Sequence, residues 1–169
     1  MSGADGPHGL RCALQLLPAD RMLEFAAFGG TAAGLQNWPL APGGVRRGAQ
    51  GRPEMLHFAP ARWLLPEPDA SSCAAAAAAA AAGTGTAVDV EGKWSVMTFE
   101  GPDARRLLSA SLDVAAVLES RDCAAVVLFD CPAVITASGE GYWIFLKASY
   151  AADFRAAVLR LCADARSAG

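Results

Sequence analysis

Cys131 is the strongest candidate for nucleophilic chemistry. It stands between Asp130 and Pro132, where an apolar, strand-like segment is interrupted. A cysteine becomes a good nucleophile when a nearby base or a helix terminus lowers the pKa of its thiol. The sequence identifies no such partner for Cys131, so we expect a structural thiol at this position.

Histidine and glutamate could together bind a metal ion, but the sequence offers few of these ligands. His8 lies near the amino end, and His57 follows Glu54 by three residues in a segment that reads as a strand. An odd spacing on a strand directs two side chains to opposite faces. A protein metal site needs three or four converging ligands. We therefore expect His57 to be an ordinary strand residue and predict no metal site.

Acidic residues could act as general acids or bases. Asp113, Glu119 and Asp122 flank one predicted loop, and Glu140 stands between two glycines at a predicted turn. Water keeps the pKa of such a turn carboxyl ordinary, and short charge runs usually mark a solvated loop. We predict no catalytic residue in this chain.

The four tryptophans could stack on a planar ligand or anchor an interface. Trp63, Trp94 and Trp143 lie in predicted strands, where core packing is the usual role. Trp38 instead opens a stretch rich in proline and glycine that extends to Pro53, and buried tryptophans often dominate interface energies. We predict a docking interface at Trp38, Pro39 and Leu40.

In the first half of the chain, these residues are carried by short elements. Period-2 apolar patterns predict strands, and proline, glycine or acidic residues mark the ends and starts of elements. The expected elements are a strand over Leu10–Leu17, a helix over Arg21–Phe28 capped by Asp20, a hairpin of Glu54–Phe58 and Arg62–Leu65, an alanine helix ending at Ala82 before Gly83, and a flexible hinge over Gly83–Thr86.

The second half has clearer patterns. Trp94 and Val96 alternate with Met97 and Phe99, as in a central strand that is buried on both faces. The expected elements are a strand over Lys93–Glu100, a helix over Asp103–Ala110, strands over Ala124–Phe129 and Ala133–Ala137, a return strand over Tyr142–Lys147 and a last helix that Ser149 caps.

The two halves look like a duplication. Each reads as a strand, a helix, a hairpin and a second helix, and Trp63 and Trp143 hold corresponding places. We predict an α+β fold of two β-α-β-β-α units that form a two-layer sandwich with the helices on one side. Residues 1–9 are expected to be a disordered tail, followed by a single domain over 10–166 with pseudo-repeats 10–83 and 87–166.

Composition narrows the class of protein. The chain has 169 residues, of which 53% are hydrophobic and 18% are charged, with a net charge of −3. This balance argues against a nucleic-acid binder, and the short cluster Arg46, Arg47 and Arg52 reads as a solvated loop. The five cysteines form no CxxC pair, and no apolar run is long enough to span a membrane. We therefore expect the chain to be located in a reducing cytoplasm.

Four ordered segments resemble a known family. The segment Val88–Leu108, with Gly101-Pro102-x-Ala104, resembles the strand-to-helix segment of the aminomethyltransferase-like, folate-binding superfamily. Within that superfamily, the segment Met55–Leu65 and the short chain resemble the gamma subunit of heterotetrameric sarcosine oxidase, although Ala59 and Arg62 replace the glycine and acid usual there. The Trp38-Pro-Leu-Ala-Pro segment and the Tyr142–Leu146 strand followed by Ser149 extend the resemblance.

This resemblance implies a structural role. In such complexes an alpha subunit holds the folate and nicotinamide (NAD) sites, a beta subunit holds the flavins (FAD and FMN), and a delta subunit holds zinc. The gamma subunit packs on the alpha subunit and binds no cofactor itself. The assembled enzyme demethylates an N-methyl amino acid oxidatively and passes the one-carbon unit to tetrahydrofolate. The alternative is a stand-alone folate-binding module or a remnant aminomethyltransferase, although no acid stands where that family has its catalytic aspartate.

Overall fold

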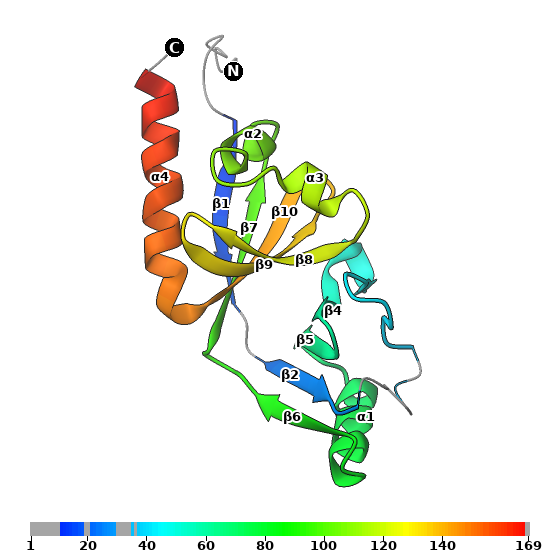
Figure 1. Cartoon of the computed structure of the whole chain (residues 1–169). Helices are drawn as coiled ribbons and strands as arrows, with labels where there is room; N and C mark the ends of the chain where they lie inside the picture. Colours follow the sequence, from blue (N-terminus) through cyan, green and yellow to red (C-terminus); the bar gives the residue numbers. More distant parts are fainter. Residues whose placement is uncertain (1–10, 19–20, 30–34, 36, 168–169) are drawn as a thin grey trace.

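The computed structural model describes residues 11–18, 21–29, 35 and 37–167 (Figure 1). The expected tail over 1–9 and the capping residue Asp20 lie outside the described residues. The strands are β1 (Ala13–Leu17), β2 (Met22–Ala27), β3 (Val45–Arg47), β4 (Pro53–Ala59), β5 (Arg62–Pro66), β6 (Gly85–Asp89), β7 (Trp94–Glu100), β8 (Cys123–Leu128), β9 (Cys131–Ala137) and β10 (Gly141–Lys147). The helices are α1 (Ala70–Ala81), α2 (Ala104–Leu108), α3 (Val114–Leu118) and α4 (Ala151–Ser167), with 3₁₀ turns η1 (Ala49–Gly51) and η2 (Ala148–Tyr150).

The strands form two five-stranded sheets with matching strand orders. One sheet has the order β8-β9-β10-β7-β1, and the other has the order β3-β4-β5-β2-β6. Every strand of the first sheet therefore has a counterpart at the same position in the second. The first strand of each half pairs in the sheet of the other half, because β1 pairs antiparallel with β7 and β6 pairs antiparallel with β2.

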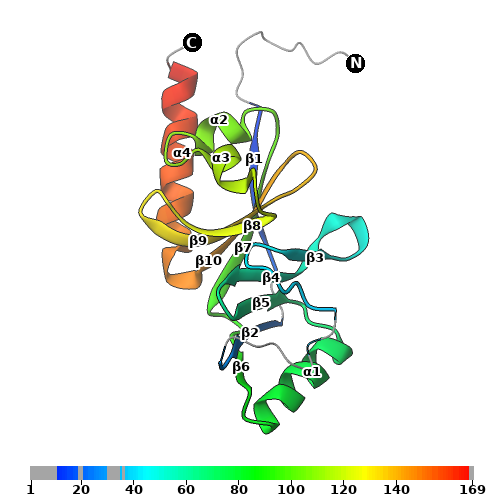
Figure 2. The same cartoon turned by 45° about the vertical axis from the view of Figure 1, so that its right-hand side comes forward.

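The layers run helix, sheet, sheet, helix. Helices α2, α3 and α4 cover the sheet that contains β7, and α1 covers the other sheet (Figures 1 and 2). The two sheets contact each other through one apolar cluster, which includes Leu56 and Leu64 from one sheet and Val96, Val134 and Phe145 from the other. The expectation that all helices lie on one side of a two-layer sandwich is therefore wrong, because each sheet carries helices on its outer face.

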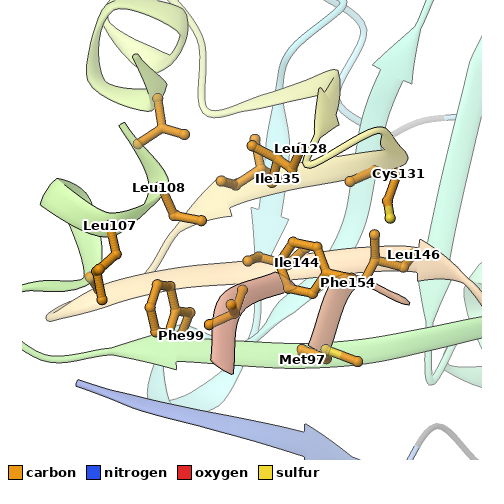
Figure 3. Packing of buried hydrophobic residues seen from close by; sticks show 14 of the residues in the cluster. Met97, Phe99, Leu107, Leu108, Leu128, Cys131, Ile135, Ile144, Leu146 and Phe154 are labelled. Carbon is orange, nitrogen blue, oxygen red and sulfur yellow. The ribbon is translucent and has the colours of Figure 1, made fainter. Parts of the chain in front are cut away.

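The alternation predicted for β7 is confirmed. Trp94 and Val96 lie in the cluster between the sheets, whereas Met97 and Phe99 lie in the core under the helices. In that outer core, Phe154 of α4 packs over the sheet beside Ile144 and Leu146 (Figure 3). A strand with apolar residues on both faces is expected to be buried on both faces. Strand β7 accordingly lies between β1 and β10 in its sheet.

The helix expected over Arg21–Phe28 is wrong, because this segment forms strand β2. It is hydrogen-bonded to β5 on one side and to β6 on the other. The expected hinge over Gly83–Thr86 likewise runs into strand β6, and the irregular stretch after Trp38 contains β3 and η1. Pairing with neighbouring strands overrides the local preference in β2.

The predicted alanine helix is confirmed as α1. The Asp69 carboxylate accepts a hydrogen bond from the Ser72 backbone nitrogen at 2.7 Å, and Gly83 follows the helix with a φ of +70°. That hydrogen bond, with others from the side chains of Ser72 and Ser71, lowers the pKa of Asp69. An acidic cap at the start and a left-handed glycine after the end define the length of this helix.

Candidate interaction surface

The predicted interface residues Trp38, Pro39 and Leu40 differ in exposure. The Trp38 ring is only 5% exposed, and its centroid lies 5.2 Å from that of Phe25 in an edge-to-face contact. The Trp63 indole nitrogen donates a hydrogen bond to the Pro39 carbonyl oxygen at 2.9 Å, which fixes the loop on the sheet. Trp38 therefore packs inside this chain, contrary to an anchoring role in a partner, whereas Leu40 is 66% exposed.

His57 is buried beneath this loop. Its ring stacks on Trp63 with centroids 4.2 Å apart and planes 19° apart, and 3% of the residue is exposed. Neither ring nitrogen has a hydrogen-bond partner among the described residues. Burial lowers the pKa of His57, and the nearby backbone of Ala41 and Pro39 opposes this shift without reaching hydrogen-bond geometry. His57 is thus a neutral core residue, held apart from Glu54, which pairs with Arg46 at 3.4 Å.

Stability should fall on mild acidification because of His57. With a folded-state pKa below the ordinary value of about 6.5, the unfolded chain binds more protons than the folded chain at lower pH. The contribution of His57 to the unfolding free energy is complete at pH values above its unfolded-state pKa. It is lost as the pH falls below that pKa, by at most about 1.4 kcal/mol per pH unit for one proton. Urea unfolding between pH 7.5 and pH 5 should show this loss in wild type.

Two variants isolate this effect. His57→Phe keeps an aromatic ring against Trp63 but cannot titrate, so its stability should be flatter over the same pH range. His8→Gln is the matched control and should keep the wild-type slope. An identical slope in wild type and His57→Phe would show that His57 is already free to take up a proton when folded.

A groove of 570 Å³ lies between the two halves. One wall is formed by Arg47 and Gly51, and the other by residues around the β9–β10 turn: Glu100, Ala137, Ser138, Gly139, Glu140 and Trp143. The Arg47 guanidinium donates hydrogen bonds to the Thr136 hydroxyl at 2.8 Å and to the Gly51 carbonyl at 3.2 Å. The Ser138 hydroxyl is buried without a partner among the described residues.

The sequence did not predict this groove. Its two walls come from residues about fifty to ninety positions apart, and no local pattern joins Arg47 to Ser138. The fold also separates the tryptophans that were expected to correspond. Trp63 packs in the cluster under α1, whereas Trp143 lies beside the cluster between the sheets and lines the groove.

The predicted basic cluster does not form a free anion site. Arg46 lies 3.4 Å from Glu54 and 3.7 Å from Asp69, and Arg52 pairs with Glu67 at 2.5 Å. Arg46 and Arg47 lie in strand β3, contrary to the predicted solvated loop, and the ion pairs use the charges of Arg46 and Arg52 within the chain.

The cysteine nucleophile candidate is buried. Cys131 is 2% exposed, and burial, followed by the charges of Asp153 and Asp130, raises the pKa of its thiol. Burial also raises the pKa of Cys123 to about 12. Neither thiol provides the thiolate that nucleophilic catalysis needs.

The acidic residues predicted to flank a loop have a clearer role. The Asp113 carboxylate accepts hydrogen bonds from the backbone nitrogens of Ala115 and Ala116, so it caps α3, a helix that the sequence analysis missed. An aspartate just before an apolar run was the available signal.

The described residues contain neither a candidate metal site nor a candidate membrane-spanning helix. No group of three or more His, Cys, Asp or Glu side chains in the described ranges is placed to hold a metal ion. No helix of the part of the chain that the structure describes is both long enough and apolar enough to cross a membrane.

Other proteins have a similar fold of two stacked sheets with helices on the outer faces. The glycine cleavage system aminomethyltransferase T from Bartonella henselae has a similar structure, with a TM-score of 0.57 and 14% identity over 90% of this chain. This chain spans 46% of that protein, so it corresponds to about half of it. No protein-family model matches the chain, and no curated protein matches it by sequence.

A second solved structure is matched over most of its length. A chain of the heterotetrameric sarcosine oxidase from Corynebacterium sp. U-96, in complex with pyrrole 2-carboxylate, has a TM-score of 0.70 and 23% identity, covering 92% of this chain and 84% of that one. The resemblance inferred from the sequence is therefore confirmed at the level of the fold, which is that of a sarcosine oxidase subunit and of an aminomethyltransferase.

Proposed function

We propose that this chain is a small structural subunit of a heterotetrameric, sarcosine-oxidase-like complex. One observation supports the proposal: the structural match to a chain of such an enzyme covers 92% of this chain and 84% of that one. The aminomethyltransferase match, by contrast, leaves more than half of the larger protein without a counterpart. The sarcosine oxidase chain is therefore matched over a larger share of its own length, 84% against 46%.

The geometry of the candidate residues supports a non-catalytic role. Cys131 is sealed in the core, His57 is stacked on Trp63, and Asp113 caps a helix. Each of these three groups thus has a structural explanation. In the proposed complex, the oxidative demethylation of an N-methyl amino acid and the transfer of its one-carbon unit to tetrahydrofolate take place on the other subunits. Those subunits would hold FAD, FMN, NAD and zinc, and the complex would be cytoplasmic.

The partner we propose for direct contact is the large alpha-type subunit. Leu40 offers an exposed apolar side chain on a loop that Trp38 and the Trp63–Pro39 hydrogen bond hold rigidly. A rigid loop loses little conformational entropy on binding, which favours a tight interface. Leu40 therefore replaces Trp38 as the proposed anchor.

Leu40→Asp should weaken docking by about tenfold or more, as expected when a buried interface side chain is replaced by a charge. Biolayer interferometry against the immobilised alpha-type subunit measures the effect. Leu159→Asp is the matched control, because Leu159 is also a leucine with more than half of its surface exposed, at 54%. Equal affinities of the two variants for the alpha-type subunit would show that Leu40 is not part of the interface.

The second candidate is a stand-alone folate-binding module or remnant aminomethyltransferase. The groove between the halves favours it, because an aromatic residue, Trp143, and two acidic residues, Glu100 and Glu140, are among the residues that line it. Calorimetric titration of the isolated chain with tetrahydrofolate, and then with FAD, separates the candidates. The subunit proposal expects no binding of either, and saturable micromolar binding of tetrahydrofolate would favour the module.

A further inference from the structure

Cys12 and Cys162 bring two thiols together from opposite ends of the chain. Their sulfur atoms lie 3.9 Å apart, although 150 residues separate them in the sequence. Both residues are partly buried at the edge of the core that lies under α4. A disulfide needs its sulfurs about 2.05 Å apart, so the two sulfur atoms must approach each other by about 2 Å before a bond forms.

The backbone holds both cysteines in place. Next to Cys12, the Arg11 backbone nitrogen donates to the Asp103 carboxylate at 2.9 Å, and the Asp103 nitrogen donates back to the Arg11 carbonyl at 3.4 Å. Cys162 follows Val158 by one helical turn, and Val158 is 1% exposed. Helical residues four apart share a face, so the buried seam of α4 directs Cys162 toward β1.

The other cysteines are less suited to exchange. Burial raises the pKa of Cys123 and of Cys131, which keeps both thiols protonated. Cys73 is partly exposed, and its sulfur lies 3.7 Å from an Arg21 nitrogen and 4.0 Å from the Pro68 carbonyl. Among the described residues, Cys12 and Cys162 are the two cysteines with sulfur atoms in contact.

We propose that Cys12 and Cys162 form a reversible thiol–disulfide modification site that clasps α4 onto β1. The co-reactant is a small-molecule disulfide. One cysteine thiolate attacks it, forming a mixed disulfide and releasing one small thiol. The second thiolate then displaces the other small thiol and closes the internal bond, so two protein thiols lose two protons and two electrons as one disulfide is reduced to two thiols.

A disulfide between Cys12 and Cys162 would link two elements that also line a groove on the surface. Strand β1 and helix α4 also form the walls of an apolar groove of 320 Å³ lined by Leu14, Leu16, Met97, Ala151, Ala152 and Arg155. Cys12 directly precedes β1, and Cys162 lies in the second half of α4, whereas Ala151, Ala152 and Arg155 of the groove lie in its first half. A covalent link there would fix α4 against the edge strand.

The test uses the full chain in oxidised glutathione. Intact mass spectrometry should show loss of two hydrogens, and peptide mapping should join Cys12 to Cys162. The thermal midpoint should rise by about 5 to 10 °C, because the bond closes a very long loop, and dithiothreitol should reverse the rise. Cys73→Ser should behave like wild type, whereas Cys162→Ser should show neither the internal bond nor the rise.

Two outcomes would overturn the proposal. One is glutathione attached separately to Cys12 or Cys162 in the native chain with no internal bond. The other is an internal bond that forms only after urea is added, which would show that the folded chain holds the thiols apart.

Discussion

Cutting the chain between Gly83 and Thr84 is expected to leave both fragments unfolded, although each carries most of one sheet. The first fragment holds β1 to β5 with α1, and the second holds β6 to β10 with α2 to α4. Strand β1 would lose β7, its partner, and strand β2 would lose β6. Each fragment would also expose its side of the apolar cluster between the sheets, with Leu56 and Leu64 on one and Val96 and Phe145 on the other.

The expected loss is the whole unfolding free energy, about 5 to 15 kcal/mol for a domain of this kind. Circular dichroism should show no cooperative thermal transition for either fragment alone. Refolding the two together should restore one transition, because the exchanged strands recover their partners. The predicted organisation as a single domain of two pseudo-repeats is tested directly by this experiment.

A second cut provides the matched control. Cutting between Glu91 and Gly92, in the turn between β6 and β7, leaves β6 with the sheet that it completes. Fragment 1–91 should therefore hold more sheet structure than fragment 1–83. A cooperative transition in fragment 1–83 alone would contradict the account, because it would show that the first half folds without the exchanged strand.

Trp63→Ala is the second change with a large expected effect. It should lower the unfolding free energy by about 3 to 5 kcal/mol. Trp63 is 2% exposed, lies 5.8 Å from both Phe25 and Trp38 by ring centroids, and stacks on His57. Its removal leaves a cavity under α1 and an unsatisfied Pro39 carbonyl. Urea unfolding followed by far-UV circular dichroism measures the change.

Two further variants separate the causes. Trp63→Phe keeps a ring but loses the hydrogen bond to Pro39, so its cost should be smaller, at about 1 to 3 kcal/mol. Trp143→Ala removes a tryptophan that is only partly buried and should cost less than Trp63→Ala. A loss below about 1 kcal/mol for Trp63→Ala would mean that the aromatic cluster does not hold the loop.

The hairpins could be predicted because their signals are local. The β4–β5 and β9–β10 hairpins each show period-2 patterns on both sides of a short turn, and each is followed by a helix. Asp69 and Gly83 similarly mark the two ends of α1. In these segments the strand or helix pattern and the turn chemistry agree, which is why sequence reasoning succeeded.

Strand β2 was missed because a charge hides its alternation. Met22 faces the other sheet and Phe25 faces α1, but Glu24 lies on the inner face where an apolar residue would be expected. Glu24 pairs there with Arg62 and, at 3.5 Å, with Lys147 of the opposite sheet. Only the folded chain shows that two cations from distant strands satisfy this carboxylate.

The candidate sites depend even more on contacts between distant residues. The groove joins Arg47 to Ser138, and the thiol pair joins Cys12 to Cys162. Trp38 seemed suited to an interface because its loop is rich in proline and glycine, yet the loop folds back so that Trp38 meets Phe25. Sequence patterns indicate which residues are apolar, but the strand order decides which surface covers them.

Co-purification tests the proposed role most directly. A tagged chain is co-expressed with the alpha-, beta- and delta-type sarcosine oxidase subunits of its own source organism, and the product is analysed by size-exclusion chromatography with absorbance detection. Our account predicts that the chain elutes with the three other subunits in equal amounts, in a peak that carries flavin absorbance. Elution of the chain alone as a monomer, while the others assemble without it, would contradict the account.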